Sequence, residues 1–128
     1  MPRTTTAILA ALLILASSGC ATRASEPGLL DDAALQAYAA GSFDKAMMGQ
    51  TVELGRHHGV PVVAEFRCGD VCPQYTVRII HYRLPERADC AAVGGVEKSV
   101  AVPVAIAVME ETFCVPKVLA QEGTYYAR

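Results

Sequence analysis

Hydrophobic side chains recur at two different spacings along this chain, first at the spacing of a helix and then at that of a strand. Residues 29–40 (LLDDAALQAYAA) carry apolar side chains near one helical face, with Asp31 or Asp32 as a candidate N-cap and Gly41 as a stop. This pattern predicts a short amphipathic helix. In residues 42–49 the helical spacing continues for another turn, and its apolar side chains are expected in the core.

From residue 50 onward the apolar positions alternate, which is typical of strands. Residues 51–54 and 60–68 are rich in β-branched side chains and flank a polar loop at 55–59 that is bracketed by glycines, so they predict a hairpin. Every other side chain of the second strand is expected to face the core. His57 and His58 fall in the predicted loop, either as a solvated tip or as a metal-binding or pH-sensing feature.

Two further alternating segments follow. Residues 75–84 (YTVRIIHYRL) have apolar area on both faces, which predicts a central strand partly covered by the helix, with His81 at the edge of the core. A polar loop over residues 85–98 leads to residues 100–109, which alternate as one long strand. Pro103 is expected at a sheet edge or a bulge of this strand.

The last part of the chain leaves two alternatives open. Residues 110–112 (EET) interrupt the alternation, and residues 113–120 resume it either through a β-bulge or after a reversing turn. Residues 121–128 are polar and aromatic and are expected to be loose. Together these elements predict a single α+β domain over residues 29–128, with a small antiparallel sheet of about four to five strands and one N-terminal helix packed on it.

A different apolar run precedes this domain. Residues 7–16 (AILAALLILA) contain no charge and follow Arg3. As a helix this run would span about 15 Å, roughly half of a 30 Å hydrocarbon core, so it is too short for a permanent transmembrane helix. A basic start, an apolar middle and a small-residue end predict a secretory signal peptide over residues 1–19.

The signal ends in residues 18–20 (SGC), which resemble the processing site of bacterial lipoproteins. The resemblance implies that Cys20 is linked to diacylglycerol and becomes the new N-terminus, so that acyl chains anchor the protein to a membrane. Residues 20–28 are then the lipidated N-terminus and a polar tether. The Ala21 that follows implies outer-membrane sorting, with the domain facing the periplasm. The alternative is ordinary cleavage near Ala21 or Ala24, which would release a soluble periplasmic or secreted protein.

Assigning Cys20 to lipid leaves four cysteines, an even number that predicts two disulfides in an oxidising compartment. They are Cys68, Cys72, Cys90 and Cys114. Four cysteines allow three pairings, and we favour the one in which the CGDVC turn closes on itself. Alternatively, Cys68 and Cys72 form a thiol-redox pair, although such pairs are usually spaced C-x-x-C at the start of a helix. A zinc site would need two further ligands, and no second cysteine or histidine pair has metal-type spacing.

Residues 68–79 (CGDVCPQYTVRI) also resemble the C-x3-C-P-x-Y-[ST]-x-x-I signature that opens an uncharacterised domain family of bacterial envelope proteins. The resemblance is confined to this segment. It implies a strand after the cysteine turn, and it implies no activity.

Composition and motifs restrict the function further. A net charge of −2 and the lack of a Lys/Arg cluster argue against nucleic acid as a partner. The sequence contains no nucleophile elbow, phosphate-binding loop or H-E-x-x-H motif, so it predicts no catalytic residue, no metal and no cofactor. The leading hypothesis is a noncatalytic envelope lipoprotein that is held on a membrane and binds or supports an unknown envelope protein. The alternatives are a thiol-redox protein using Cys68 and Cys72, and a small-ligand or metal carrier using His57 and His58.

Overall fold

The computed structural model describes residues 28–128, so the predicted signal peptide, Cys20 and all of the tether except Gly28 lie outside the described residues. Its elements follow in the order α2 (Asp32–Ala40), η1 (Lys45–Met47), β1 (Thr51–His57), β2 (Val60–Arg67), β3 (Val77–Tyr82), η2 (Ala91–Val93), β4 (Gly95–Val104), β5 (Ala107–Pro116), α3 (Lys117–Glu122) and β6 (Tyr126–Ala127). None of the helices among these residues is long and apolar enough to span a bilayer.

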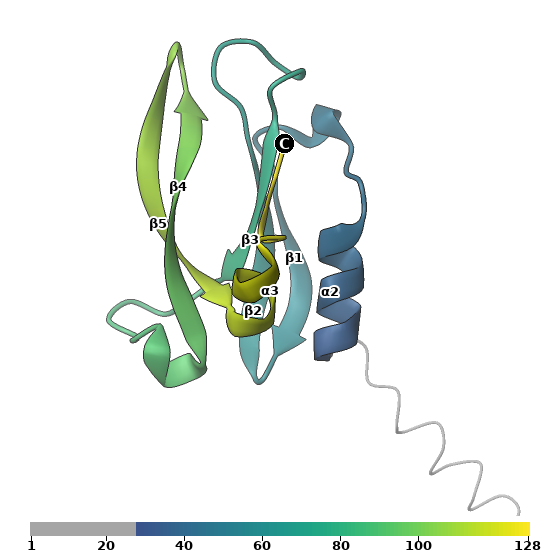
Figure 1. The fold of residues 1–128 in the computed structure, drawn as a ribbon, viewed down its shortest axis with the longest axis vertical. Helices are drawn as coiled ribbons and strands as arrows, with labels where there is room; N and C mark the ends of the chain where they lie inside the picture. The colour runs from purple at the N-terminus through teal and green to yellow at the C-terminus, as the bar shows by residue number, and fades with distance from the viewer. Residues whose placement is uncertain (1–27) are drawn as a thin grey trace, which may run out of the picture.

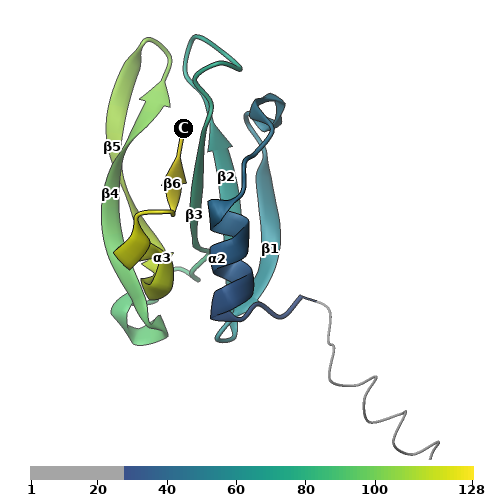
Figure 2. The same cartoon turned by 45° about the vertical axis from the view of Figure 1, so that its right-hand side comes forward.

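The middle layer of the fold is a four-stranded antiparallel sheet in the order β1-β2-β3-β6. Strands β4 and β5 pair only with each other, as a long hairpin. Figures 1 and 2 show α2 on one side of the sheet and the hairpin on the other. The predicted α+β class, with an antiparallel sheet and an N-terminal helix, is therefore confirmed. The hairpin is a third layer that the sequence pattern did not separate from the sheet.

The register of β2 with β3 sorts their side chains into two faces. Ala64 lies opposite Ile80, and this face packs against Leu35 of α2 and Leu119 of α3. The expected burial of alternate β2 side chains is confirmed here. Val63 was expected to point away from the core, yet it is buried as well. It lies on the side of the sheet that the hairpin covers, where strands need to be apolar on both faces.

Strand β3 is the central strand that its two-sided apolar pattern predicts. It pairs with β2 along one edge and with β6 along the other. The expectation of a loose C-terminal segment is wrong, because Tyr126 pairs with Ile79 and Ala127 with Arg78. Without β6, this edge of β3 would leave backbone N–H and C=O groups without hydrogen-bond partners. The end of the chain supplies those partners. The Tyr126 hydroxyl also donates to the Ala101 carbonyl, at 3.1 Å, and so ties β6 to β4.

The first hairpin turn is shorter than predicted. The expected loop over residues 55–59 is wrong, because β1 continues to His57, which pairs with Val60. Only His58 and Gly59 form the turn, with φ angles of 51° and 78°. A two-residue turn in which both φ angles are positive matches the twist of the strands that it joins. Glycine adopts a positive φ freely, and histidine adopts it more easily than most other residues do. His57 thereby moves from a solvated loop into a strand, where its side chain is 2% exposed.

The second hairpin replaces the single strand predicted over residues 100–109. The chain reverses at residues 105–106, so that β4 ends at Val104 and β5 begins at Ala107. Both alternatives for residues 113–120 are also wrong, because β5 runs unbroken through residues 110–112 and α3 starts directly after it. Ala105 adopts a positive φ of 46° although it is not a typical turn residue, so nothing in the local sequence marks this reversal.

Helix α2 begins at Asp32, directly after the first of the two predicted N-cap candidates. The Asp31 carboxylate accepts a hydrogen bond from the Ala34 N–H at 2.8 Å, which makes Asp31 the N-cap, as one of the two predicted candidates. Leu29 instead forms a parallel bridge with Arg56 at the end of β1. Of the predicted helical turn over residues 42–49, only the short η1 is formed.

The other end of α2 is held by a buried arginine from the central strand. The Arg78 side chain is only 1% exposed, and its guanidinium donates to the carbonyls of Ala39 at 2.7 Å, Gly41 at 3.2 Å and Tyr38 at 3.4 Å. Its cation also lies 5.1 Å from the Tyr38 ring centre and 5.2 Å from that of Phe43. Burial lowers the pKa of Arg78, and Tyr38 partly opposes this. The carbonyl end of the helix, which carries partial negative charge, therefore stabilises the buried cation.

Replacing Arg78 tests how much this contact stabilises the fold. We expect Arg78→Met to lower the free energy of unfolding by about 3 kcal/mol, because buried helix carbonyls lose a charged donor. Urea denaturation followed by circular dichroism measures the change. The control is Arg83→Met, since the Arg83 side chain is half exposed and its one ion pair among residues 28–128 is with Glu53, at 3.9 Å. It should change stability by no more than about 0.5 kcal/mol. Equal midpoints for the two variants would contradict the assigned role.

Candidate functional site

The four described cysteines form two disulfides, Cys68–Cys72 and Cys90–Cys114. This is the favoured pairing among the three that the sequence allowed. Disulfides persist in oxidising compartments outside the cytoplasm, so the covalent structure indicates an extracytoplasmic protein.

The Cys68–Cys72 disulfide closes a tight loop between β2 and β3. The next regular element is strand β3, so within residues 28–128 no helix begins at either sulfur. A reactive thiol pair usually depends on a helix N-terminus or a nearby cation to stabilise its thiolate. The loop instead lies against the tip of the second hairpin, because a side chain at Gly69 would collide with the backbone of Ala105. This contact favours a structural role for the disulfide.

A cluster of titratable side chains lies at the opposite end of the sheet, where β1 turns into β2. His57 places its Nε2 atom 2.6 Å from Oδ1 of Asp32, the first residue of α2, and its Nδ1 atom 2.7 Å from the Tyr82 hydroxyl of β3. His58 stacks on His57 with ring centres 3.9 Å apart, and its Nε2 atom lies 4.0 Å from the same Asp32 oxygen. Side chains from α2, β1 and β3 therefore meet in one chain of hydrogen bonds, and His58 of the turn packs against it.

The two ends of this chain of hydrogen bonds differ in their exposure to solvent. Asp32 is exposed, whereas His57 and Tyr82 are buried. Burial raises the pKa of Tyr82, and the negative charge of Asp32 raises it further, so the phenol keeps its proton. A carboxylate only accepts hydrogen bonds, so Nε2 of His57 carries the ring proton and donates it to Asp32, while Nδ1 accepts from the Tyr82 hydroxyl. The two partners thus fix both the position of the ring and its tautomer.

A cleft of about 400 Å³ opens beside this cluster. Its walls come from Asp32, His57 and His58 together with Gly94 after η2 and Lys117, Val118 and Gln121 of α3. The cleft is therefore assembled from four segments that are far apart in the sequence. A small polar ligand can reach the imidazoles through it.

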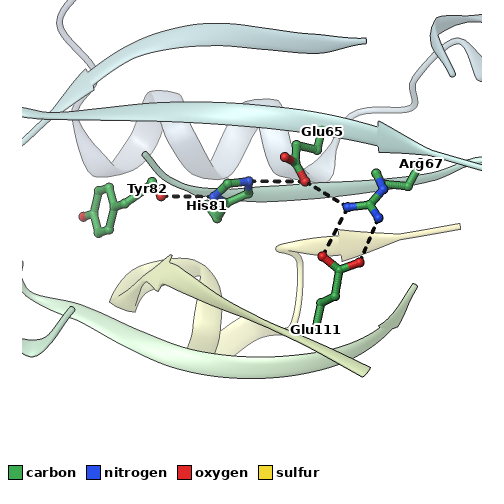
Figure 3. A network of polar contacts seen from close by, with 5 residues as sticks. All are labelled: Glu65, Arg67, His81, Tyr82 and Glu111. Atoms are coloured by element: carbon green, nitrogen blue, oxygen red, sulfur yellow. Dashed lines mark hydrogen bonds and ion pairs between the residues drawn. The ribbon is translucent and has the colours of Figure 1, made fainter. Parts of the chain in front are cut away.

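A second polar network joins the sheet to the hairpin (Figure 3). Arg67 of β2 makes two hydrogen bonds to the Glu111 carboxylate of β5, at 2.8 and 3.4 Å, and lies 3.6 Å from Glu65. His81 lies 3.6 Å from the same Glu65 and donates from Nδ1 to the Tyr82 carbonyl. These residues lie between two packed layers and are partly buried, so they fasten the hairpin. His81 thus lies at the edge of the core, as predicted, and it is not part of the His57 cluster.

The tip of the β4–β5 hairpin exposes an unusual amount of apolar surface. Ile106 is 90% exposed, Val108 70% and Met109 52%. Val71 and Tyr75 of the disulfide loop are also mostly exposed and line the same cleft of about 510 Å³ as the hairpin tip. We name these five side chains the tip patch. Four of them, all except Met109, line this one cleft, and exposed apolar side chains gathered in this way mark interaction surfaces.

Comparisons with family models, curated proteins and solved structures give no match to this chain. The resemblances of residues 18–20 and 68–79 therefore stay predictions. No function can be transferred from a relative, and the geometry of the described residues has to support any proposal.

The sequence identified His57 and His58 as a pair but missed their surroundings. The sequence pattern places Asp32 at the start of a helix and Tyr82 within a strand, and nothing in it brings the two together. The burial of His57 could not be predicted from the sequence, because it depends on which residues form the turn.

The disulfides give a direct test of the covalent structure. We expect the double variant Cys90→Ala/Cys114→Ala to lose about 3.5 kcal/mol of unfolding free energy and Cys68→Ala/Cys72→Ala about 2 kcal/mol, because the first bridge closes the longer loop. Urea denaturation measures both losses. A thiol titration of the unfolded, unreduced wild type should find none of these four thiols free. Peptide mapping that finds Cys68 or Cys72 joined to Cys90 or Cys114 would refute the pairing.

Proposed function

We propose that this protein is a noncatalytic module of the bacterial cell envelope, anchored by lipid at Cys20, that binds another envelope protein through the tip patch. The observation that carries the proposal is the exposure of Ile106, Val108 and Met109 on a protruding hairpin. Residues 99–109 contain no charged side chain, so the hairpin tip offers only apolar and neutral groups to a partner.

The surroundings of the tip patch favour a protein as its occupant. The cleft between the hairpin tip and the disulfide loop has Asp70 as its one charged lining residue. A carboxylate is repelled by an anionic lipid surface, whereas it can pair with an Arg or Lys side chain at the rim of a protein interface. We therefore infer a partner with an apolar centre and a basic side chain beside it.

The direction of the tip patch supports the same occupant. Figures 1 and 2 show the hairpin tip at one end of the fold, and the start of the described chain, where Leu29 bridges Arg56, at the other. If the chain before residue 28 leads to an acylated Cys20, the tip patch lies on the end that faces away from the anchoring membrane. A partner in the periplasm can reach it there, and the lipids around the anchor are at the opposite end.

Lipid anchoring and outer-membrane location are the finer parts of the proposal. They are supported by the lipoprotein-like residues 18–20 and by the cysteine count, since Cys20 is the single cysteine outside the two disulfides. Ala21 supports sorting to the outer membrane, with the domain in the periplasm. Two or three acyl chains hold a domain on a membrane stably, whereas a single chain gives only reversible binding.

The anchor can be tested by labelling. We expect the wild type to incorporate a labelled fatty acid in a bacterial host and to yield a mature N-terminal peptide that starts at Cys20, whereas Cys20→Ala should lose the label completely. The double variant Cys68→Ala/Cys72→Ala is the matched cysteine control and should keep the label. Mature peptides that start after Cys20 and carry no label would support the alternative of a soluble periplasmic or secreted protein.

The partner can be tested by photocrosslinking in intact bacteria. A photoreactive side chain at residue 106 should give one discrete protein adduct, whereas the same side chain at residue 112 should not, because Thr112 is exposed on the same hairpin but outside the tip patch. Adding Val108→Asp should reduce the adduct by about tenfold or more, since it places an unpaired carboxylate in the apolar contact.

Two results of this experiment would contradict the proposal. Adducts of equal yield from residues 106 and 112 would mean that the hairpin is contacted without specificity. Adducts with lipid alone would mean that the tip patch meets a membrane, and a protein interface would then be wrong.

A further inference from the structure

We propose that Asp32, His57 and His58 form a binding site for a divalent transition-metal ion, with Zn²⁺ as the best fit, at the end of the fold opposite the tip patch. The inference goes beyond the proposed function, because it concerns a different surface and a different ligand. One ligand atom from each of the three residues lies within 4.8 Å of the other two. Two imidazoles and one carboxylate are a donor set that zinc binds well.

His57 is the rigid part of this site. It is 2% exposed, it ends strand β1, and Nδ1 is held 2.7 Å from the Tyr82 hydroxyl. Nε2 faces the Asp32 carboxylate and the cleft. A histidine whose second nitrogen is fixed by a hydrogen bond in this way is typical of metal sites, because the outer partner sets the ring orientation and raises its basicity.

His58 and Asp32 are the adjustable part. His58 stacks on His57 with an angle of 23° between the rings, which brings both imidazoles to the same oxygen of Asp32. The present separations from that oxygen are 2.6 Å to Nε2 of His57 and 4.0 Å to Nε2 of His58. Ligand atoms around tetrahedral zinc are about 3.4 Å apart at bond lengths near 2.1 Å. The side chains of His58 and Asp32 are mostly exposed, at 68% and 59%, so both have room to move toward these separations.

Three protein ligands leave the fourth position of a tetrahedral ion open to the cleft. Lys117 and Gln121 line the same cleft. The cation of Lys117, the first residue of α3, and an open metal position suit a small anionic ligand, such as a carboxylate. The site therefore has the form of a zinc centre that retains an exchangeable ligand.

Binding requires one rearrangement of protons, and the cluster permits it. In the metal-free state the Asp32 carboxylate accepts the proton on Nε2 of His57, and Nδ1 accepts from the Tyr82 hydroxyl. When Nε2 bonds to the metal, its proton passes to solvent and Nδ1 takes one up from solvent, so the ring stays neutral and donates from Nδ1 to the Tyr82 oxygen. The phenol turns from donor to acceptor without moving. Both nitrogens of His57 thus keep a partner in each state.

A metal titration of the purified full-length protein tests the site. After treatment with EDTA and its removal, the wild type should bind one equivalent of Zn²⁺ in competition with a chromophoric chelator. Its thermal midpoint should rise with Zn²⁺ concentration, since an ion that binds only the folded state stabilises it. Tyr82→Phe should weaken the affinity by roughly 10–100-fold, as expected for an outer partner of a ligand.

Two ligand variants with matched controls identify the residues. Asp32→Asn and His58→Asn should each weaken Zn²⁺ binding at least as much as Tyr82→Phe does, by roughly 10–100-fold or more. Asn suits the left-handed turn at residue 58, so His58→Asn removes the imidazole without disturbing the fold. The neighbouring Asp31→Asn makes the same charge change and keeps the helix cap, because Asn caps as well as Asp. It should bind Zn²⁺ like the wild type.

Failure of the wild type to bind an equivalent of Zn²⁺ would overturn the proposal. So would unchanged affinity in Asp32→Asn and His58→Asn, because the ion would then be held elsewhere. Equal losses in Asp31→Asn and Asp32→Asn would reduce the effect to surface charge and would also overturn it. Each of these results leaves the photocrosslinking at residue 106 unaffected, so the two proposals can fail separately.

Discussion

The contact between Arg78 and the C-terminal carbonyls of α2 determines how the layers of this fold meet. Helix α2 has nine residues, a length at which an isolated helix is unstable in water. The Asp31 cap stabilises its first turn, and the Arg78 cation of the central strand binds its last carbonyls. Just before the helix, the Leu30 N–H donates to the Arg56 carbonyl at 2.8 Å, so Asp32 lies beside the turn between β1 and β2. The cluster of Asp32, His57 and His58 thus depends on a helix that is attached to the sheet at both ends.

The two ends of the sheet carry different chemistry, and each has its own disulfide. At the hairpin tip, the Cys68–Cys72 loop lies against residues 103–105 and holds the apolar tip patch in place. At the other end, Gly95 allows the Cys90–Cys114 bridge to approach the Tyr82 ring, beside the histidine cluster. A small domain with little core to spare can in this way keep two exposed surfaces rigid.

Much of the candidate site was open to prediction, but its depth was not. Two adjacent histidines, an aspartate at the start of a predicted helix and four cysteines that need partners are all visible in the sequence. The burial of His57 follows from a turn of two residues in place of five, and local sequence alone gave no reason to prefer the shorter one. In the sequence, Arg78 is a polar position on a predicted strand. Only the tertiary structure places the carbonyls at the end of α2 around its guanidinium, where they take the place of water.

The sequence by itself determined the periodic elements: a capped helix, alternating strands, a central strand with two apolar faces, and an even set of cysteines. These depend on local spacing and on composition, which act within a few residues. The tertiary structure alone decided that residues 100–109 fold back on themselves, that the C-terminal residues complete the sheet, and that Asp32, His57 and Tyr82 meet. Alternation looks the same in one long strand and in two paired ones, and an unpaired strand edge attracts a partner only once the sheet exists.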